Sequence, residues 1–334
     1  MKILFFCPSK FNLNSEKNNS LGGVEALNLA LSNILAKKGY NVTLSTDCKS
    51  IIKRRNLVNL PISEIISNPK KYQFDYIISS NEPYIYQYYN DSKKIFWMHN
   101  TLALEKAVRK KKLFSLLTSK ITAIFVSKYL NDVTSKLYFF NKRIVIPNFL
   151  TTEYKKKKIN NHRNKNVIWS VQRKRGLIET INMWIKYIYP NNKNAKFFIF
   201  AIEKDKSLKS KNFYSRYNIF FFGRVSKNKL NNIYNKSSIA ICLGYDETFC
   251  LNAIEANSCG LPVITFGKTA LNEIVKHNYN GFVVDDFKKM ANTLNRHLNL
   301  DNSRLNKYAR NSFNYSKKYT VEKIIPKWVK LLKK

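Results

Sequence analysis

Short apolar runs along the chain alternate with longer segments whose apolar residues recur at helical spacing. Residues 2–7 form the first apolar run and end at a polar loop, and residues 24–38 then show helical spacing up to Gly39. Residues 42–45 follow as another short apolar run. A strand, a glycine-containing loop, a helix and a second strand are the usual opening of a doubly wound α/β domain.

The alternation continues in both halves of the chain, on either side of a segment without periodicity. The first half predicts further strands at 74–79, 94–98, 121–126 and 143–146, and helices at 83–89, 104–117 and 128–139. The second half predicts strands at 166–170, 196–200, 219–222, 239–243 and 263–266, and helices at 176–189 and 230–235. We therefore expect Rossmann-like domains over residues 1–150 and 166–316, a Lys- and Asn-rich linker over 151–165, and a terminal helix within 317–334.

The most informative stretch is 244–262, which reads GYDETFCLNAIEANSCGLP. Asp246 and Glu247 precede Thr248, a favourable N-cap residue, and a Gly-Leu-Pro sequence ends the predicted helix. The free backbone N–H groups at this helix start would form an anion site, and we assign them to Phe249, Cys250 and Leu251.

Two glutamates flank this anion site, Glu247 before the helix and Glu255 nearly two turns along it. At about 1.5 Å rise per residue, they would lie roughly 9–12 Å apart along the axis. A nucleotide diphosphate-sugar has a matching shape, with its ribose at Glu255, its diphosphate at the helix start and its sugar at Glu247. An exposed helix with two solvated glutamates is the alternative, and the spacing alone leaves both open.

Residues 220–284 resemble the donor site of retaining glycosyltransferases of family four, which are group 1 glycosyltransferases with the GT-B fold. The shared features are the acidic pair, the Glu-Thr-Phe opening, the Glu-Ala pair in the helix and the Gly-Leu-Pro-Val-Ile exit. The resemblance implies two Rossmann-like domains facing a cleft, with the last helix crossing back to the first domain. It also implies metal-independent transfer of a hexose-type sugar from a nucleotide diphosphate-sugar to a hydroxyl of a glycan or glycolipid, such as a surface polysaccharide or lipopolysaccharide, without a further cofactor.

The resemblance extends to three other places. It puts Gly22 and Gly23 on the cleft floor, where a glycine pair lets the backbone approach a ligand, although such a pair is also a common tight turn. It makes His99 a positioning group at the reacting centre. The alternative is a loop histidine whose hydrogen bonds are satisfied within the protein. Arg173 and Arg175 would grip the diphosphate, but the family usually has Lys-Gly where this chain has Arg175 followed by glycine. The separate roles of the two arginines stay open. The alternative is that this segment is a basic turn exposed to solvent that binds no ligand.

The chain is strongly basic, and its composition offers two explanations for this charge. The formal net charge is +38, with 23 basic against 9 acidic residues in 1–150 and 36 against 12 in 151–334. Abundant Lys, Asn, Ile, Tyr and Phe are typical of AT-rich coding, which explains part of this charge; an anionic surface or substrate is the other explanation. The basic amphipathic segment 104–117 would suit peripheral contact with an anionic membrane, and a solvated face of a core helix is its alternative.

The cysteines, the histidines and the absence of long apolar segments limit the classes of protein to which the chain could belong. Five cysteines without a Cys-x-x-Cys pair indicate reduced thiols in a cytoplasmic protein, and four histidines lack metal-ligand spacing, so we expect no metal. We expect no signal peptide or membrane-spanning segment. The rival functions are a nucleotide-sugar epimerase on the same fold and a nucleic-acid-binding protein. A catalytically silent carbohydrate-binding relative is a third, although the retained acidic pair argues against it. No specific nucleic acid is expected, because the chain has no zinc knuckle, helix-turn-helix signature or RNP-like aromatic run.

Overall fold

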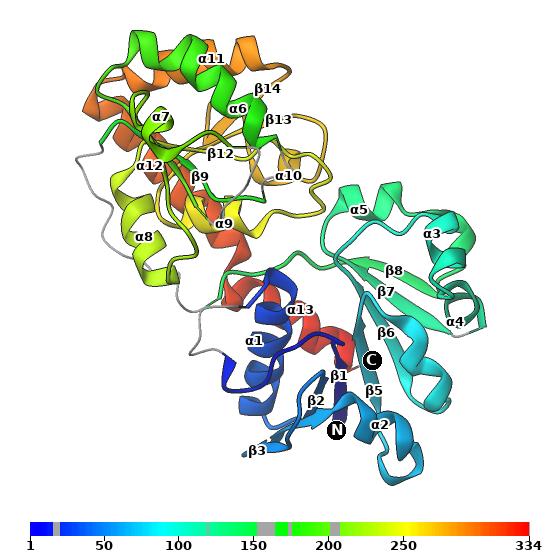
Figure 1. The fold of residues 1–334 in the computed structure, drawn as a ribbon. Coiled ribbons are helices and arrows are strands. Elements are labelled where there is room, and N and C mark those ends of the chain that lie inside the picture. Colours follow the sequence, from blue (N-terminus) through cyan, green and yellow to red (C-terminus); the bar gives the residue numbers. More distant parts are fainter. Residues whose placement is uncertain (16–20, 119, 152–163, 173–175, 201–207, 334) are drawn as a thin grey trace. The chain divides into compact units, whose positions relative to one another are not determined.

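The computed structural model describes residues 1–15, 21–118, 120–151, 164–172, 176–200 and 208–333. The chain divides into two compact units (Figure 1). Unit 1 comprises Met1–Thr151 together with Val321–Lys334, and unit 2 comprises Thr152–Thr320. Among the described residues, no helix is long and apolar enough to cross a membrane.

Unit 1 is built on one eight-stranded sheet. Its strands are β1 (Lys2–Phe6), β2 (Asn41–Thr46), β3 (Ile52–Arg54), β4 (Leu57–Pro61), β5 (Tyr76–Ser80), β6 (Lys93–Met98), β7 (Ile121–Phe125) and β8 (Lys142–Val145). Their order in the sheet is β3-β4-β2-β1-β5-β6-β7-β8, and only the edge pair β3 and β4 is antiparallel. Both β1 and β5 are almost entirely buried, as strands of a parallel sheet covered on both faces must be.

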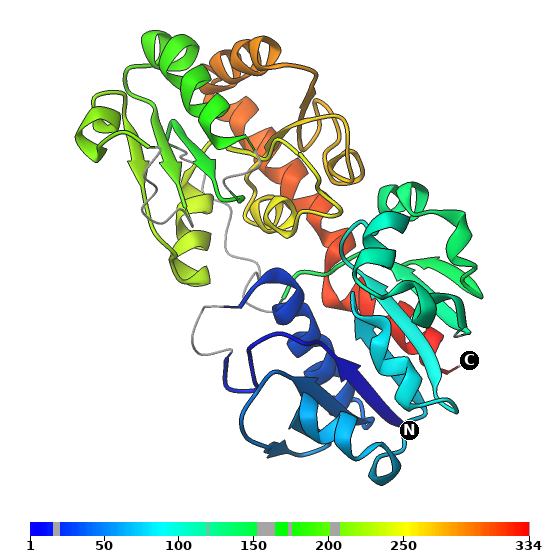
Figure 2. The ribbon, with the colours of Figure 1, turned by 45° about the vertical axis from the view of Figure 1, so that its right-hand side comes forward.

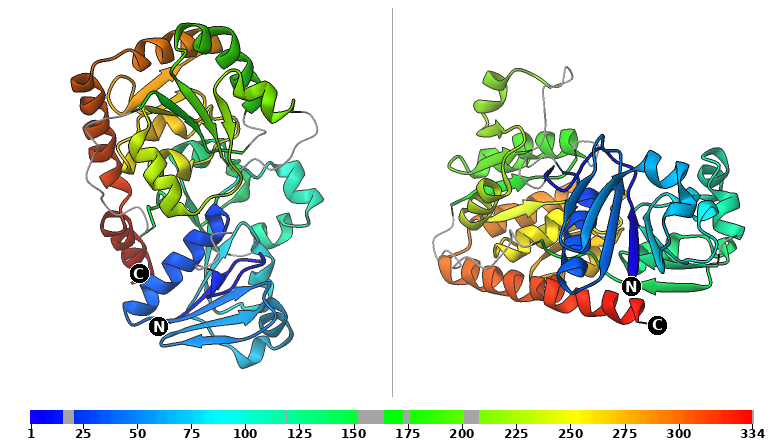
Figure 3. Two further views of the ribbon diagram at one scale, coloured as in Figure 1. Left: turned by 60° about the vertical axis from the view of Figure 1, so that its left-hand side comes forward. Right: turned by 90° about the horizontal axis from the view of Figure 1, so that it is seen from below.

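Helices surround this sheet, and the end of the chain supplies one of them. They are α1 (Gly23–Lys37), α2 (Ile62–Ser67), α3 (Leu104–Arg109), α4 (Leu113–Thr118), α5 (Lys128–Val133) and α13 (Val321–Leu332), with the 3-10 helices η2 (Pro69–Lys71), η3 (Pro83–Tyr88) and η4 (Lys136–Tyr138). Trp328 of α13 is fully buried against Trp97 of β6, with 4.9 Å between ring centroids. This aromatic contact packs the last helix onto unit 1, where both ends of the chain lie (Figure 3).

Unit 2 is built on a six-stranded, fully parallel sheet. Its strands are β9 (Asn166–Trp169), β10 (Lys196–Ile199), β11 (Ile219–Phe221), β12 (Ile239–Ile241), β13 (Val263–Phe266) and β14 (Gly281–Val284). The order is β11-β10-β9-β12-β13-β14, so the third, second and first strands of the unit are followed by its fourth, fifth and sixth. This is the Rossmann order, with a switch point between β9 and β12.

Helices cover both faces of the unit 2 sheet (Figures 1 and 2). They are α6 (Leu177–Met183), α7 (Lys211–Ser215), α8 (Lys227–Lys236), α9 (Leu251–Ser258), α10 (Leu271–Ile274), α11 (Phe287–Leu298) and α12 (Asn302–Ser316), with the π-helical turn η7 (Trp184–Ile188) and the 3-10 helices η8 (Tyr189–Asn191) and η9 (Lys317–Tyr319). α6 and α11 lie on one face, and α8, α9 and α12 on the other, as right-handed crossovers on either side of the switch point require.

These sheets confirm the predicted α/β class with two Rossmann-like parts, but several predicted elements differ. The segment 83–89 is a 3-10 helix, and 128–139 divides into α5 and η4. The single helix expected over 104–117 is wrong, because Lys111 adopts a left-handed φ of 53° and separates α3 from α4. Strands β3, β4 and β14 and helices α11 and α12 were not predicted.

Candidate active site

The switch point of unit 2 defines the candidate site. β9 pairs with β10 on one side and with β12 on the other, and the chain leaves β9 and β12 toward opposite edges of the sheet. Open α/β sheets bind ligands outside the carboxyl ends of the two strands at such a point. Ser170 and Cys242 follow these two strand ends, so the segments that begin there line the site.

The loop from β12 to α9 has an unusual, fixed backbone. Gly244, Asp246 and Cys250 all have positive φ, at 90°, 52° and 68°. The N–H of Glu247 donates to the carbonyl of Gly244 at 3.3 Å, and the carbonyl of Glu247 accepts from the N–H of Ala270 at 3.3 Å. Positive φ at non-glycine residues is costly and gathers at functional sites. The loop therefore holds the half-buried Glu247 in one backbone position.

The expected N-cap at Thr248 is wrong. Helix α9 begins at Leu251, and its N-cap residue is Cys250, which makes no side-chain capping hydrogen bond. The first-turn N–H groups therefore belong to Leu251 and Asn252, whereas Phe249 and Cys250 precede the helix. The start of the helix, and with it the predicted anion site, moves along the chain by two residues, and Leu251 is the one predicted donor that stays in it.

Helix α9 is tied directly to the end of β9. The side-chain amide of Asn252 donates to the carbonyl of Ser170, whose hydroxyl lies 2.6 Å from the hydroxyl of Tyr234 on α8. Burial, and then the nearby charge of Glu255, raise the pKa of Tyr234 well above its ordinary value. Glu255 thus lies close to this polar cluster at the switch point. Asn252 and Tyr234 were not predicted for this site, because only tertiary packing brings them to Ser170.

The thiol of Cys250 is an unsuitable nucleophile. A hydrogen bond with Cys242, burial and the charge of Glu247 raise the pKa of Cys250 well above its ordinary value. A protonated, buried thiol is inert, so Cys250 shapes the loop and does not react. The same electrostatic influence shows that the carboxylate of Glu247 lies near the start of α9.

Arg173 and Arg175 lie outside the described residues, and the description resumes at Gly176. Gly176 has φ of 96°, and a Cβ there would lie 2.5 Å from Cδ1 of Leu243 and 2.8 Å from Cε2 of Tyr245. Glycine is required by both the φ and the close approach. Gly176 therefore lies directly against the loop after β12.

The remaining candidates lie in unit 1, after β1 and β6. Gly22 is the N-cap residue of α1, and the carboxylate of Glu25 folds back against it. Burial, and then the charge of Glu25, raise the pKa of Cys7 to about 12, which places Glu25 near the carboxyl end of β1. Gly22 and Gly23 thus lie at the carboxyl edge of the unit 1 sheet, beside an acidic side chain.

His99 is buried directly after β6. Its backbone N–H donates to Oδ1 of Asn81 at 2.9 Å, and its ring centroid lies 4.5 Å from that of Trp97. Burial lowers the pKa of His99 to about 3, so the imidazole is neutral at physiological pH. A neutral histidine can donate or accept one hydrogen bond without carrying charge. Asn81, which holds the backbone of His99, was not among the predicted residues.

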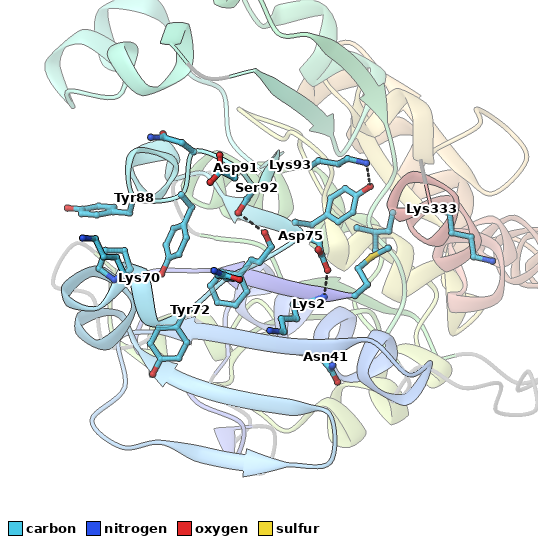
Figure 4. Close-up of a pocket in the computed structure, with 18 residues that line it drawn as sticks. Lys2, Asn41, Lys70, Tyr72, Asp75, Tyr88, Asp91, Ser92, Lys93 and Lys333 are labelled. Carbon is cyan, nitrogen blue, oxygen red and sulfur yellow. Dashed lines mark hydrogen bonds between the residues drawn. The ribbon is translucent and has the colours of Figure 1, made fainter.

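Other features of the described chain lie away from these sites. No group of three or more His, Cys, Asp or Glu side chains suited to a metal occurs within the described residues. A cavity of about 1220 Å³ opens in unit 1 at the amino ends of β1, β2, β5 and β6 (Figure 4). Asp75 accepts from the N–H of Lys2 at 2.6 Å in its wall, and Lys93 donates to the hydroxyl of Tyr76 at 3.3 Å. It occupies the edge of the sheet opposite His99.

The two doubly wound units define the GT-B fold. Residues 152–313, most of unit 2, match the family described as glycosyl transferases group 1. This match identifies the protein as a glycosyltransferase and confirms the resemblance of residues 220–284 to the group 1 enzymes. Its site candidates are distributed over both units, with Gly22, Gly23 and His99 in unit 1 and the described donor-site candidates in unit 2.

Solved structures resemble the whole chain at low identity. Sucrose-phosphate synthase from Thermosynechococcus elongatus has a TM-score of 0.76 and 16% identity, covering 100% of this chain and 98% of that chain. HepE from Anabaena in complex with UDP has a TM-score of 0.74 and 14% identity, covering 100% of both chains. WaaG, a glycosyltransferase involved in lipopolysaccharide biosynthesis, has a TM-score of 0.70 and 13% identity, covering 98% and 99%. No curated protein sequence matches the chain.

Proposed function

We propose that the protein is a retaining glycosyltransferase that moves a hexose-type sugar from a nucleotide diphosphate-sugar to a hydroxyl of a glycan or glycolipid. The observation that carries this proposal is the fixed loop at the switch point of unit 2, which places Glu247 just before the start of α9. Two structures of HepE with a similar fold contain UDP or UDP-glucose, which supports a nucleotide-sugar as the donor.

Each part of the donor has a proposed partner. Glu255 binds the ribose hydroxyls, and the first-turn N–H groups of α9 bind the diphosphate at the positive end of the helix. Arg173 and Arg175 complete the diphosphate site from the segment that ends at Gly176. Glu247 and the residues from Thr248 to Leu251 bind the sugar.

Transfer then needs neither a metal nor a protein nucleophile. The bond between the anomeric carbon and the diphosphate oxygen breaks, and a bond to the acceptor oxygen forms on the same face of the sugar. The acceptor proton passes to the departing diphosphate oxygen. Cationic and N–H groups around that diphosphate stabilise its developing charge. His99, neutral because of burial, positions the acceptor and is no general base.

The acceptor class and compartment are also proposals. WaaG acts in lipopolysaccharide biosynthesis, and its whole-chain similarity supports a glycan or glycolipid acceptor. All five cysteines are free thiols in the structure, and reduced thiols suit the cytoplasm as the place of action.

Donor binding is tested by thermal unfolding with UDP, GDP, ADP and their common sugar conjugates. A ligand that binds only the folded state stabilises by RT ln(1 + [L]/Kd), so one nucleotide should raise the Tm by several degrees. Glu255→Ala should abolish that rise, and Glu179→Ala, an exposed glutamate in the first turn of α6, should retain it. A Tm unaffected by every nucleotide would contradict the proposal.

Transfer is tested by release of nucleotide diphosphate from the donor that this screen identifies. Release should require an acceptor, and the product should keep the anomeric configuration of the donor. Turnover of the nucleotide-sugar without an acceptor would favour an epimerase instead.

A further inference from the structure

Exposed apolar side chains gather on three neighbouring elements of unit 1. The side chains are Val108 (58% exposed), Phe114 (73%), Leu117 (48%), Leu137 (57%) and Phe139 (76%). They belong to α3, α4 and η4 with its C-cap residue, and α4 contacts both α3 and η4. We call these five residues the α3–α4–η4 surface. Grouped exposed apolar residues on a folded protein mark an interaction site or a membrane contact.

Folding stability does not explain this surface. Phe139 has a left-handed φ of 43°, which is unfavourable for a bulky side chain, and yet the ring is three-quarters exposed. The position therefore has both backbone strain and an exposed aromatic ring, although an asparagine would adopt the same φ at lower cost. Strain that persists at an exposed aromatic residue indicates a functional use for the side chain.

The surroundings of this surface are strongly basic. Residues 104–142 contain nine Lys and Arg residues against two acidic residues. Arg109, Lys110 and Lys111 are exposed between α3 and α4, and Lys136 is exposed in η4. Exposed apolar and aromatic side chains among cations are the pattern of a surface that inserts between anionic lipid headgroups.

Hydrogen bonds connect this surface to the carboxyl edge of the unit 1 sheet. Lys112, buried between α3 and α4, donates to the carbonyl of Asn81 at 2.8 Å and pairs with Glu82 at 2.5 Å. Asn81 in turn accepts the N–H of His99. From η4, the hydroxyl of Tyr138 donates to the carbonyl of Leu102 at 2.9 Å. The surface therefore adjoins the strand ends where the proposed acceptor is positioned.

We propose that the α3–α4–η4 surface inserts into an anionic lipid bilayer and brings a membrane-embedded glycolipid acceptor to the His99 edge of unit 1. The choice of acceptor rests on the proposed function, whereas the bilayer contact rests on the exposed residues and their charge. Apolar insertion supplies one part of the binding energy, and attraction of the cations to anionic headgroups supplies the other. Binding to vesicles is consequently sensitive to both salt and apolar substitutions.

The test is flotation of the full chain with vesicles of phosphatidylcholine alone or with about one third phosphatidylglycerol, an anionic fraction that attracts basic surfaces. The wild-type chain should bind only the anionic vesicles, and less at high salt. Phe114→Ser with Phe139→Asn should weaken binding by about tenfold or more, because buried apolar area is lost. Ile51→Ser removes an apolar residue that is 51% exposed elsewhere in unit 1, and should bind like the wild type.

Three further variants separate the effects of charge and of folding from those of lipid contact. Arg109→Glu with Lys110→Glu should abolish the preference for anionic vesicles, whereas Lys49→Glu with Lys53→Glu, at exposed positions before and in β3, should change it little. Phe139→Asn alone should weaken vesicle binding while its Tm stays the same or rises, because the left-handed strain is relieved.

Two outcomes would overturn the membrane contact: no binding of the wild-type chain to anionic vesicles, or equal binding by the variants with the apolar residues removed. Nucleotide stabilisation measured on the same variants keeps the two proposals apart. If vesicle binding behaves as expected but no nucleotide raises the Tm, the proposed transferase function fails and the lipid contact stands.

Discussion

The two units share the order of six parallel strands around the switch point, β4-β2-β1-β5-β6-β7 in unit 1 and β11-β10-β9-β12-β13-β14 in unit 2, but the loops at their switch points differ. In unit 2, nine residues join the end of β12 to the start of α9, and three of them have positive φ. In unit 1, sixteen residues join the end of β1 to the start of α1. The short loop fixes Glu247 through its own backbone hydrogen bonds. The same order of parallel strands can therefore be combined with a short, hydrogen-bonded loop in one unit and a longer connection in the other.

The electrostatic environments of the two candidate regions also differ. In unit 2 the acidic side chains Glu247 and Glu255 are half-buried near the start of α9. In unit 1 burial keeps His99 neutral and raises the pKa of Cys7 to about 12. Under the proposed function, unit 2 binds a charged diphosphate and unit 1 binds an uncharged hydroxyl acceptor. The contrast suggests substitutions that should affect one region and leave the other unchanged.

The largest expected effect is that of Glu247→Gln on transfer. Removing one electrostatic contact that acts in the transition state lowers kcat by about 100-fold or more, while the similar size of glutamine should leave the Tm within about 1 °C. The measurement is the initial rate of acceptor-dependent nucleotide release. Asp246→Asn, at the exposed neighbouring position with positive φ, is the matched control, because asparagine adopts that conformation readily. Wild-type turnover in Glu247→Gln would remove Glu247 from the site.

Local pattern predicted the core strands and the loop with Glu247, because apolar runs and helix-stop residues are encoded in consecutive residues. It could not predict the break between α3 and α4. A helical segment there is interrupted because Lys112 turns inward to Asn81 and Glu82, which lie about thirty positions earlier in the chain. Tertiary hydrogen bonds of this kind override helical propensity.

The same limit applies to the candidate site. Thr248 has the side chain of a good N-cap, but the left-handed Cys250 delays the start of α9 to Leu251. Asn252 and Tyr234 reach Ser170 only through packing between elements far apart in the sequence. The roles of the glutamates, the glycine pair, His99 and the two arginines stay predictions, because they depend on a bound ligand.

A smaller effect is expected on the free energy of unfolding when the glycines near the two switch points are replaced by alanine, and it should differ between them. Gly176→Ala combines a strained φ of 96° with a Cβ against the side chains of Leu243 and Tyr245, and should lower the free energy of unfolding by about 2 kcal/mol. Gly22→Ala meets only the flexible end of Glu25 at a negative φ, and should change it by less than about 0.5 kcal/mol. Urea unfolding of both variants gives the comparison. Equal losses would mean that the unit 1 loop is as tightly constrained as that of unit 2.

The smallest expected effect at neutral pH is that of His99 protonation on the free energy of unfolding, and this effect grows as the pH falls. The folded-state pKa of about 3 lies below the ordinary value of 6.5, so the unfolded chain binds this proton first. The stability from neutral His99 is therefore complete above about pH 6.5 and is lost as the pH falls toward 3, at up to about 1.4 kcal/mol per pH unit. At pH 5 the loss from this group should be about 2 kcal/mol relative to pH 7.

In His99→Gln the stability starts lower but declines less steeply over the same range, because the side chain does not titrate. Urea unfolding of both proteins at pH 7, 6 and 5 measures the two slopes. Identical slopes would mean that His99 takes up its proton in the folded state as readily as in the unfolded chain. The carboxyl edge of unit 1 would then carry a charge, and it would no longer differ in this respect from the loop of unit 2.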